Sequence, residues 1–207
     1  LERVTAPEVS AFFDRIHREE GVNIRNGALV AALSGDSKVR DVILANGESI
    51  PADFVIVGIG VQPNTELVAA AGLTVDNGVV IDDQTRTSDH DIVAAGDCAS
   101  HDMARYGRRI RLESVPSAAE QAKVAAATIC GKPKQIAALP WFWSDQYDLK
   151  LQIAGLNTGY DRIVTRGPEG DAVSFWYFKG DHLLAVDAMN DSRAYMVGKR
   201  LIEAGRS

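Results

Sequence analysis

The spacing of apolar positions divides the chain into segments of distinct character. Apolar residues recur at helical intervals from Val9 to Ile16, which predicts a helix over residues 7–20 with Thr5 as its cap. Alternation of apolar and polar residues then replaces the helical period, and Asn46-Gly47 marks a tight turn. The pattern therefore predicts a short strand followed by a small antiparallel meander, with strands over residues 22–24, 28–33, 39–44 and 48–50.

Two continuous apolar runs interrupt this alternation. Residues 54–60 read Phe-Val-Ile-Val-Gly-Ile-Gly, and a second run covers residues 92–95. Uninterrupted apolar strands are typical of parallel sheets in which both faces are covered. We therefore predict two buried strands. The first precedes a helix over residues 65–71 that Asn64 caps, and the second leads directly into Gly96-Asp97.

The second half of the chain contains the most strongly marked helix. Ser117 and Glu120 have the S-x-x-E spacing of a capping box, an alanine-rich stretch follows to Cys130, and Gly131 is placed to end it. Beyond Pro140 the pattern changes to alternating strands, which indicates a domain boundary near residues 134–140. The elements predicted after it are strands over residues 151–154, 162–165, 173–178 and 183–188 and a final helix over residues 192–203.

The composition is that of an ordinary globular protein. The chain has 207 residues, of which 46% are hydrophobic and 24% charged. No apolar run approaches the roughly 18 residues of a membrane helix, no secretory signal is recognisable, and Leu1 is not expected to be the natural start. Cys98 and Cys130 stand far apart and outside any C-x-x-C pair, which argues against a zinc site, a disulfide or a dithiol centre. We therefore expect a cytoplasmic protein with two reduced thiols.

Charge is unevenly distributed along the chain. The formal net charge is -6, which disfavours nucleic acid as a partner. Residues 101–134 nevertheless carry seven basic and three acidic side chains, so this segment is positive within an acidic chain. Such a face can steer an acidic partner, although a solvated loop followed by a helix explains the same charges.

The stretch Thr87–Asp97 carries the most chemical information. It reads Thr-Ser-Asp-His-Asp-Ile-Val-Ala-Ala-Gly-Asp, so a predicted buried strand ends in a glycine and a carboxylate. Parallel sheets bind ligands at the carboxyl ends of their strands, where Gly96 lets a bulky ligand approach the backbone. Asp97 can there accept hydrogen bonds from a ribose or polyol hydroxyl, whereas an isolated Gly-Asp pair is more often a plain turn.

This stretch resembles the second FAD-binding motif of flavoprotein reductases with two dinucleotide-binding domains, in which the aspartate holds the ribityl chain of FAD. Residues 55–64 look like the strand that returns from the NAD domain to the FAD domain, and residues 111–122 look like the segment specific to ferredoxin, rubredoxin and putidaredoxin reductases. In that family the start of this helix lies beside the pyrimidine end of the flavin, where a helix N-terminus stabilises the charge of the reduced ring. The resemblance therefore implies an FAD site that includes Gly96, Asp97, Glu113, Ser114 and Val115.

Three aromatic residues, Trp141-Phe142-Trp143, open the part after Pro140. By composition alone such a run belongs to a core or a domain interface. In the family that the chain resembles, one tryptophan of this segment lies near the flavin and the docking face, and its position assigns that role to Trp143 and a structural role to Trp141. The partner implied is an acidic ferredoxin or rubredoxin, with Arg108, Arg109, Lys123 and Lys150 as the implied docking residues.

The family's two G-x-G-x-x-G fingerprints, one for FAD and one for NAD, do not occur in this sequence. The resemblance therefore implies an α/β fold, the C-terminal part of a flavoprotein with two dinucleotide-binding domains, followed by a small α+β domain with an antiparallel sheet. The whole protein is expected to pass electrons from NAD(P)H through FAD to a ferredoxin, and this part alone is expected to be inactive. The implied domains are the tail of the NAD domain over residues 1–52, the second half of the FAD domain over 53–134 and the C-terminal reductase domain over 135–207.

Other functions stay open on the sequence. The chain can instead act as a non-catalytic binding or dimerisation module that uses its C-terminal sheet, so a homo-oligomer is possible. A relative of NADH oxidases or peroxidases is also not excluded, because their reactive cysteine lies upstream of the matching segments. His90, His101 and His182 show no ligand spacing and are expected at the surface, so neither a metal site nor a catalytic residue is predicted.

Overall fold

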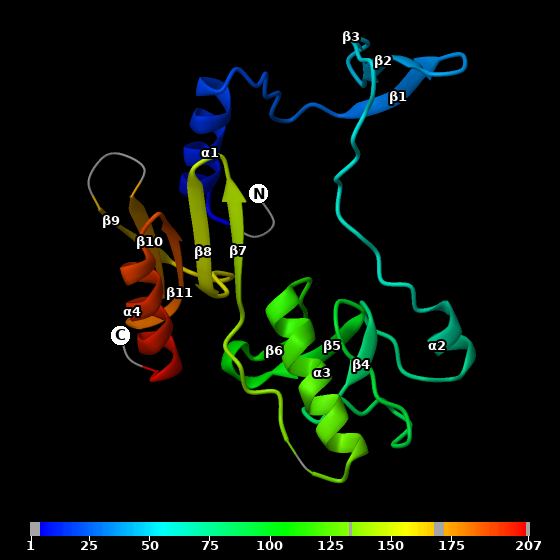
Figure 1. Ribbon diagram of the computed structural model, residues 1–207, viewed down its shortest axis with the longest axis vertical. Coiled ribbons are helices and arrows are strands. Elements are labelled where there is room, and N and C mark those ends of the chain that lie inside the picture. Colours follow the sequence, from blue (N-terminus) through cyan, green and yellow to red (C-terminus); the bar gives the residue numbers. More distant parts are fainter. Residues whose placement is uncertain (1–4, 133, 168–171, 206–207) are drawn as a thin grey trace. The chain divides into compact units, whose positions relative to one another are not determined.

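The computed structural model describes residues 5–132, 134–167 and 172–205, and these form two compact units. One unit comprises residues 10–62, and the other comprises residues 63 onward together with Thr5–Val9. Helix α1 (Pro7–Glu19) confirms the helix predicted at the start of the chain. Figure 1 shows the elements of both units in the colours of the sequence.

The smaller unit contains the predicted meander. Strands β1 (Val30–Gly35), β2 (Val39–Leu44) and β3 (Ser49–Pro51) pair in that order, and both pairs are antiparallel. The strand expected over residues 22–24 is wrong. The N–H of Val22 donates instead to the carbonyl oxygen of His17 at 2.9 Å, and the guanidinium of Arg18 donates to the carbonyl oxygen of Ile24 at 2.9 Å. Polar backbone groups that close the helix end in this way are not free to pair in a sheet.

The apolar run over residues 54–60 is not a buried strand, contrary to the prediction. Ile56 and Ile59 are 85% and 88% exposed, and no strand within the described residues pairs with this segment. A strand is a property of two neighbours, because its N–H and C=O groups need partners on adjacent chains. The apolar run is thus suited to a buried strand, but the described residues contain no neighbouring strand that pairs with it.

The larger unit begins with a short helix and a three-stranded sheet. Helix α2 (Glu66–Ala70) starts after Thr65 rather than after Asn64, which corrects the predicted cap. Strands β4 (Val79–Ile81) and β5 (Ala99–Met103) are parallel, and β5 forms an antiparallel hairpin with β6 (Arg108–Arg111) through the 3₁₀ turn η1 (Ala104–Tyr106). The strand expected over residues 92–95 is also wrong, since only an isolated bridge joins Val93 to Arg86.

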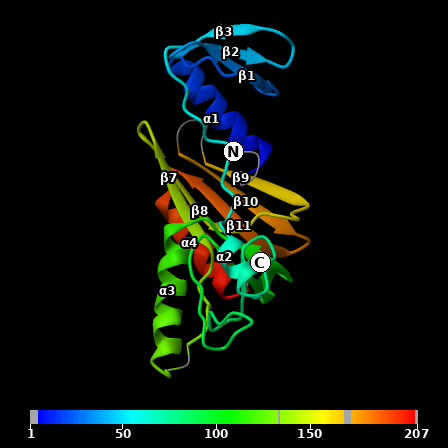
Figure 2. The same cartoon turned by 90° about the vertical axis from the view of Figure 1, so that its right-hand side faces the viewer.

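Helix α3 (Val115–Ile129) follows the hairpin and leads to an antiparallel sheet in the C-terminal part. Its strands are β7 (Trp141–Gln146), β8 (Leu149–Gly155), β9 (Arg162–Arg166), β10 (Val173–Lys179) and β11 (His182–Met189), arranged in the order β7-β8-β11-β10-β9. Helix α4 (Ser192–Glu203) ends this part and contacts β8, β10 and β11. This confirms the expected small α+β domain with an antiparallel sheet (Figure 1, Figure 2).

The two faces of the C-terminal sheet have different neighbours. The α4 face holds a buried apolar cluster in which Trp176 and Val186 meet Tyr195 and Ile202. Helix and sheet approach closely at Gly198, where an added Cβ would lie 2.5 Å from Cγ2 of Val186. On the opposite face the strand register places four side chains in one row across β7, β8, β11 and β10, namely Phe142, Ile153, Asp187 and Phe175.

Candidate functional site

The Gly96-Asp97 turn is held against the middle of α3. Gly96 adopts a φ of 91°, and its N–H donates to Oε1 of the buried side chain of Gln121 at 2.7 Å. The carbonyl oxygen of Gly96 accepts from the N–H of Ala99 at 3.0 Å, which closes the turn into β5. Asp97 itself is exposed, and its carboxylate accepts no hydrogen bond from any residue that the structure describes. The turn therefore presents an unpaired carboxylate on a fixed backbone.

Helix α3 begins three residues earlier than the capping box predicts. Ser114 is the N-cap in an extended conformation, and its Oγ accepts from the N–H of Ser117 at 3.3 Å. Pro116 has no N–H, so the N–H of Val115 is the unbonded donor in the first turn, as judged within the described part of the chain. A helix N-terminus with an unbonded N–H is suited to an acceptor atom or a negative charge.

Arg111 connects these two pieces. Its Nη1 donates to the carbonyl oxygen of Asp97 at 2.8 Å, and its Nη2 lies 2.8 Å from Oε1 of Glu113 in an ion pair. The Arg111 side chain is almost fully buried, and Gly78 makes room for it, since an added Cβ would lie 2.9 Å from Cδ of Arg111 and 2.6 Å from the carbonyl oxygen of Cys98. The structure thus brings Gly96, Asp97 and Glu113 together at the start of α3.

Arg111 and Gln121 lie within residues 111–122, and the sequence assigns neither of them a role. Their signal was weak, because a basic residue and an amide are common on any surface. What distinguishes them is that both side chains are buried and hydrogen-bonded to the turn, and this depends on how the turn and the helix pack. Glu120, expected in the capping box, instead lies 3.4 Å from Nζ of Lys134 in an ion pair.

A cleft of about 510 Å³ opens between β6, the start of α3 and the C-terminal sheet. Glu113 and Ser114 line it on one side, and Phe142 with its neighbour Trp141 lines it on the other. Trp143 does not line this cleft. It is 42% exposed on β7, with its ring centroid 5.5 Å from that of Trp141. Trp143 is thus partly exposed in this chain, and its expected place near the flavin and the docking face stays a prediction.

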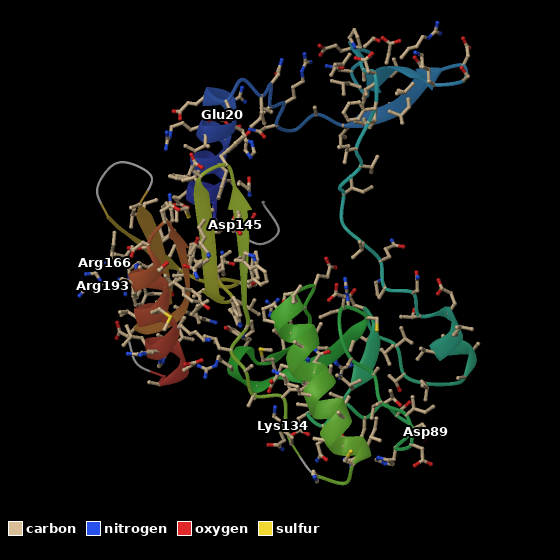
Figure 3. The ribbon with its side chains drawn as sticks, in the orientation of Figure 1. Glu20, Asp89, Lys134, Asp145, Arg166 and Arg193 are labelled. Atoms are coloured by element: carbon tan, nitrogen blue, oxygen red, sulfur yellow. The ribbon has the colours of Figure 1, made fainter. Side chains whose placement is uncertain are left out.

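The expected docking residues differ in how free their charges are. Arg109 is 3.3 Å from Asp76 and 3.0 Å from Asp102, so two carboxylates already surround it. Arg108 lies at the rim of the cleft, and Lys123 is exposed on α3, each without an ion-pair partner among the described residues. Lys150 on β8 is paired in register with Asp145 of β7, a residue labelled in Figure 3.

Two titratable groups of the larger unit are buried, and one of them, Asp187, also lines the cleft. Asp187 is 1% exposed, and its Oδ2 accepts from the hydroxyl of Tyr177 at 2.6 Å, while Oδ1 finds no partner in the described residues. His101 is buried on β5, which corrects its expected surface position, and burial lowers its pKa. His90 and His182 are exposed as expected.

Neither a metal site nor a membrane span emerges from the described residues. Among residues 5–132, 134–167 and 172–205, no three His, Cys, Asp or Glu side chains gather in a way that could hold a metal ion. Within the same residues, every helix is too short or too polar to cross a bilayer.

Comparison with known proteins gives two family matches. The model of the pyridine nucleotide-disulphide oxidoreductases matches residues 1–122, and the model described as the reductase C-terminal domain matches residues 141–207. Putidaredoxin reductase of Pseudomonas putida is 49% identical over 98% of this chain and 49% of its own length. The ferredoxin reductase subunit of 5,5'-dehydrodivanillate O-demethylase from Sphingobium is 44% identical over 99% of this chain and 51% of its own.

Solved structures agree in fold. The covalent putidaredoxin reductase–putidaredoxin complex matches with a TM-score of 0.95 and 48% identity over 99% of this chain and 50% of that chain. A ferredoxin reductase from Rhodopseudomonas palustris matches with a TM-score of 0.95 and 38% identity over 100% of this chain and 52% of that chain. The chain thus spans about half the length of the curated relatives that it matches.

Proposed function

Because this chain belongs to the pyridine nucleotide-disulphide oxidoreductase family, we propose that it supplies the carboxyl-terminal part of an FAD-dependent ferredoxin reductase. The complete protein would take electrons from NAD(P)H and pass them through FAD to a ferredoxin or rubredoxin. Relatives named as ferredoxin reductases at 49% and 44% identity support this class over an NADH oxidase or peroxidase. The proposed domains remain residues 1–52, 53–134 and 135–207.

The observation that carries the proposal is the Gly96-Asp97 turn fixed at the start of α3. An unpaired, exposed carboxylate fits a ligand with hydroxyl groups, and the free N–H of Val115 fits a ring acceptor that becomes negative on reduction. An added Cβ on Gly96 would lie 3.8 Å from Cβ of Ala118, so the backbone here is close to the helix. These features fit FAD, with Asp97 holding the ribityl hydroxyls and Ser114 and Val115 facing the ring.

Each group has a defined task in this proposal. FAD, when bound, supplies the change from two-electron to one-electron chemistry. Asp97 orients the sugar chain, Glu113 keeps Arg111 in place, and Arg111 in turn holds the Asp97 backbone. The aromatic side of the cleft, formed by Trp141 and Phe142, excludes water from the ring. No residue of this chain needs to form a covalent bond with the substrate.

The first test of the proposal is reconstitution. The chain purified alone with added FAD and NADH should not reduce a dye acceptor. When it is co-produced with the half of Pseudomonas putida putidaredoxin reductase that it does not match, the complex should be yellow. Asp97→Asn in that complex should weaken FAD binding roughly tenfold to a hundredfold, because a hydrogen bond to a charged group contributes about 1.5–3 kcal/mol.

A second exposed carboxylate of the chain provides the control for FAD affinity. Asp145→Asn removes another exposed carboxylate, on β7, and should leave FAD affinity unchanged. Dye reduction by the chain alone would overturn the expectation of inactivity. A colourless complex that is nevertheless folded and oligomeric would favour the binding-module alternative over the reductase.

Partner docking is a second, separate part of the proposal. We expect Lys123→Gln to slow association with an acidic ferredoxin more than Arg109→Gln does, because Asp76 and Asp102 already compensate the charge of Arg109. Stopped-flow association at several salt concentrations measures the difference. Equal effects of the two substitutions would show that the ion pairs of Arg109 open on docking.

A further inference from the structure

The β5–β6 hairpin ends in a tip that contacts the C-terminal sheet at two separate places. The tip consists of η1 and Gly107, whose φ of 60° returns the chain into β6. The hydroxyl oxygen of Tyr106 accepts from the N–H of Leu156 at 2.9 Å. Arg105 Nη1 donates to the carbonyl oxygen of Ile202 at 2.6 Å. Two adjacent residues of the hairpin therefore reach backbone groups that are 46 positions apart in the sequence.

The contact at Leu156 is made with a rigid part of the sheet. Leu156 directly follows β8, and the N–H of the preceding Gly155 donates to the carbonyl oxygen of Pro140 at 2.8 Å. Gly155 adopts a φ of 81°, and an added Cβ would lie 2.2 Å from the carbonyl oxygen of Leu184, so only glycine fits. Pro140 and Leu156 both line the cleft, and Tyr106 thus fixes its C-terminal wall.

The contact at Ile202 is made with the end of α4. Ile202 is buried in the last turn of this helix, where carbonyl groups carry partial negative charge, and its carbonyl oxygen also accepts from the N–H of Gly205 at 3.1 Å. A guanidinium is well suited to this position because it is always charged and donates in a fixed plane. Arg105 therefore adds an electrostatic attraction to the hydrogen bond that it makes.

These contacts change how the C-terminal domain is held. Besides these contacts, the chain segment up to Pro140 and the packing of α3 on β7 connect the C-terminal sheet to α3. A compact body joined mainly by one connection can rotate about it, and two further attachments at different elements restrict that rotation. The hairpin tip thus resists a hinge motion that would open or close the cleft.

We propose that Arg105 and Tyr106 form a clamp that fixes the orientation of the C-terminal sheet against α3. They are positioning residues, because neither lines the cleft. The clamp sets the distance between the Trp141 side of the cleft and the start of α3. An effect of the clamp on the rate of electron transfer rests on the proposed function, because that rate depends on this distance. The clamp itself does not require bound flavin.

Amide hydrogen exchange tests the Tyr106 contact. Tyr106→Phe removes the acceptor and keeps the ring, so exchange at the Leu156 amide should become roughly fivefold faster, in line with the net contribution of one hydrogen bond of about 1 kcal/mol. Exchange at Gly155, which donates to Pro140, should not change. Tyr160→Phe is the matched control, because it also removes a hydroxyl near Leu156 in the sequence but belongs to a ring that packs on Tyr177. Unchanged exchange at Leu156 would overturn the contact.

Distance measurement between spin labels tests the clamp. Cys130 at the end of α3 and Arg193→Cys at the start of α4 offer two exposed sites, with Cys98→Ser to prevent a third label. Arg193 is labelled in Figure 3. Combining Arg105→Gln with Tyr106→Phe should broaden the distance distribution. Replacing Arg105 by Lys instead of Gln in that combination should broaden it less, because the charge is kept. Arg200→Gln, at an exposed position of α4, should leave the distribution unchanged. A folded double variant with an unchanged distribution would refute the clamp whether or not the chain binds flavin.

Discussion

At the scale of single residues, the most unusual environment is that of Asp187. It occupies the centre of a row otherwise made of Phe142, Ile153 and Phe175, so a carboxyl group stands among apolar side chains. Burial raises the pKa of Asp187 to about 7, and the hydrogen bond from Tyr177 opposes this only in part. Burial and the neighbouring Asp187 also raise the pKa of the Tyr177 hydroxyl. The pair is therefore most stable with both protons in place.

This predicts a specific dependence of stability on pH. Asp187 holds its proton up to about pH 7 in the folded chain, whereas in the unfolded chain it ionises near 3.8. The folded state binds more protons between these values, so the free energy of unfolding should fall as pH rises from about 4 to 7, at up to about 1.4 kcal/mol per pH unit. Asp187→Asn should remove this slope, which denaturant unfolding at a series of pH values measures.

A second buried group acts in the opposite direction and serves as an internal check. The lowered pKa of His101 means that its contribution to stability is lost as pH falls below its usual value. The original chain and the Asp187→Asn variant both contain His101, so its contribution cancels when their free energies of unfolding are subtracted at each pH. Parallel pH profiles for the two proteins would show that Asp187 is ionised in the folded chain and that the pair is held differently.

At the scale of elements, local pattern predicted some segments well and failed at others for a physical reason. α1 and α4 were predicted nearly to the residue, because an amphipathic helix satisfies its own backbone and leaves its period in the sequence. Four of the five described strands of the C-terminal sheet were likewise predicted to within two residues, whereas β7 was read only as an aromatic run. The apolar runs over residues 54–60 and 92–95 failed because a strand needs a neighbour, and apolar sequence does not identify one.

The start of α3 gives a test at this scale. The sequence pattern placed the cap at Ser117, whereas the structure places it at Ser114, whose Oγ accepts from the N–H of Ser117. Ser114→Ala should therefore lower the free energy of unfolding by about 1 kcal/mol, the usual cost of losing an N-cap. Ser117→Ala removes only a 3.3 Å contact with Nε2 of Gln121 and should cost less. The reverse order in denaturant unfolding would support the capping box instead.

At the scale of the whole molecule, the candidate site could be predicted in part. Gly96 and Asp97 were identified because their chemistry lies in adjacent residues, and the helix that follows was recognised by its composition. Arg111 and Gln121 complete the site from 14 and 25 positions away, through contacts with Asp97 and Gly96. Such contacts depend on how β5, β6 and α3 pack, so no local pattern contains them. Trp141 and Trp143 stand two positions apart on β7 and therefore lie on the same face of the sheet, so strand register does not decide which of them approaches the flavin, and the role expected for Trp143 stays a prediction.

The exposed apolar run over residues 54–60 leads to a prediction for the chain in solution. Phe54, Ile56, Val57 and Ile59 are exposed apolar side chains close together in the sequence, and exposed apolar groups tend to associate or bind apolar dyes. Replacing Ile56 and Ile59 together by Asp should reduce self-association in light scattering and lower the fluorescence of an added apolar dye. Leu67→Asp, which changes a single exposed leucine on α2, should have a smaller effect. If both variants associate as strongly as the original chain, association must use another surface, and the C-terminal sheet would then be the next face to test.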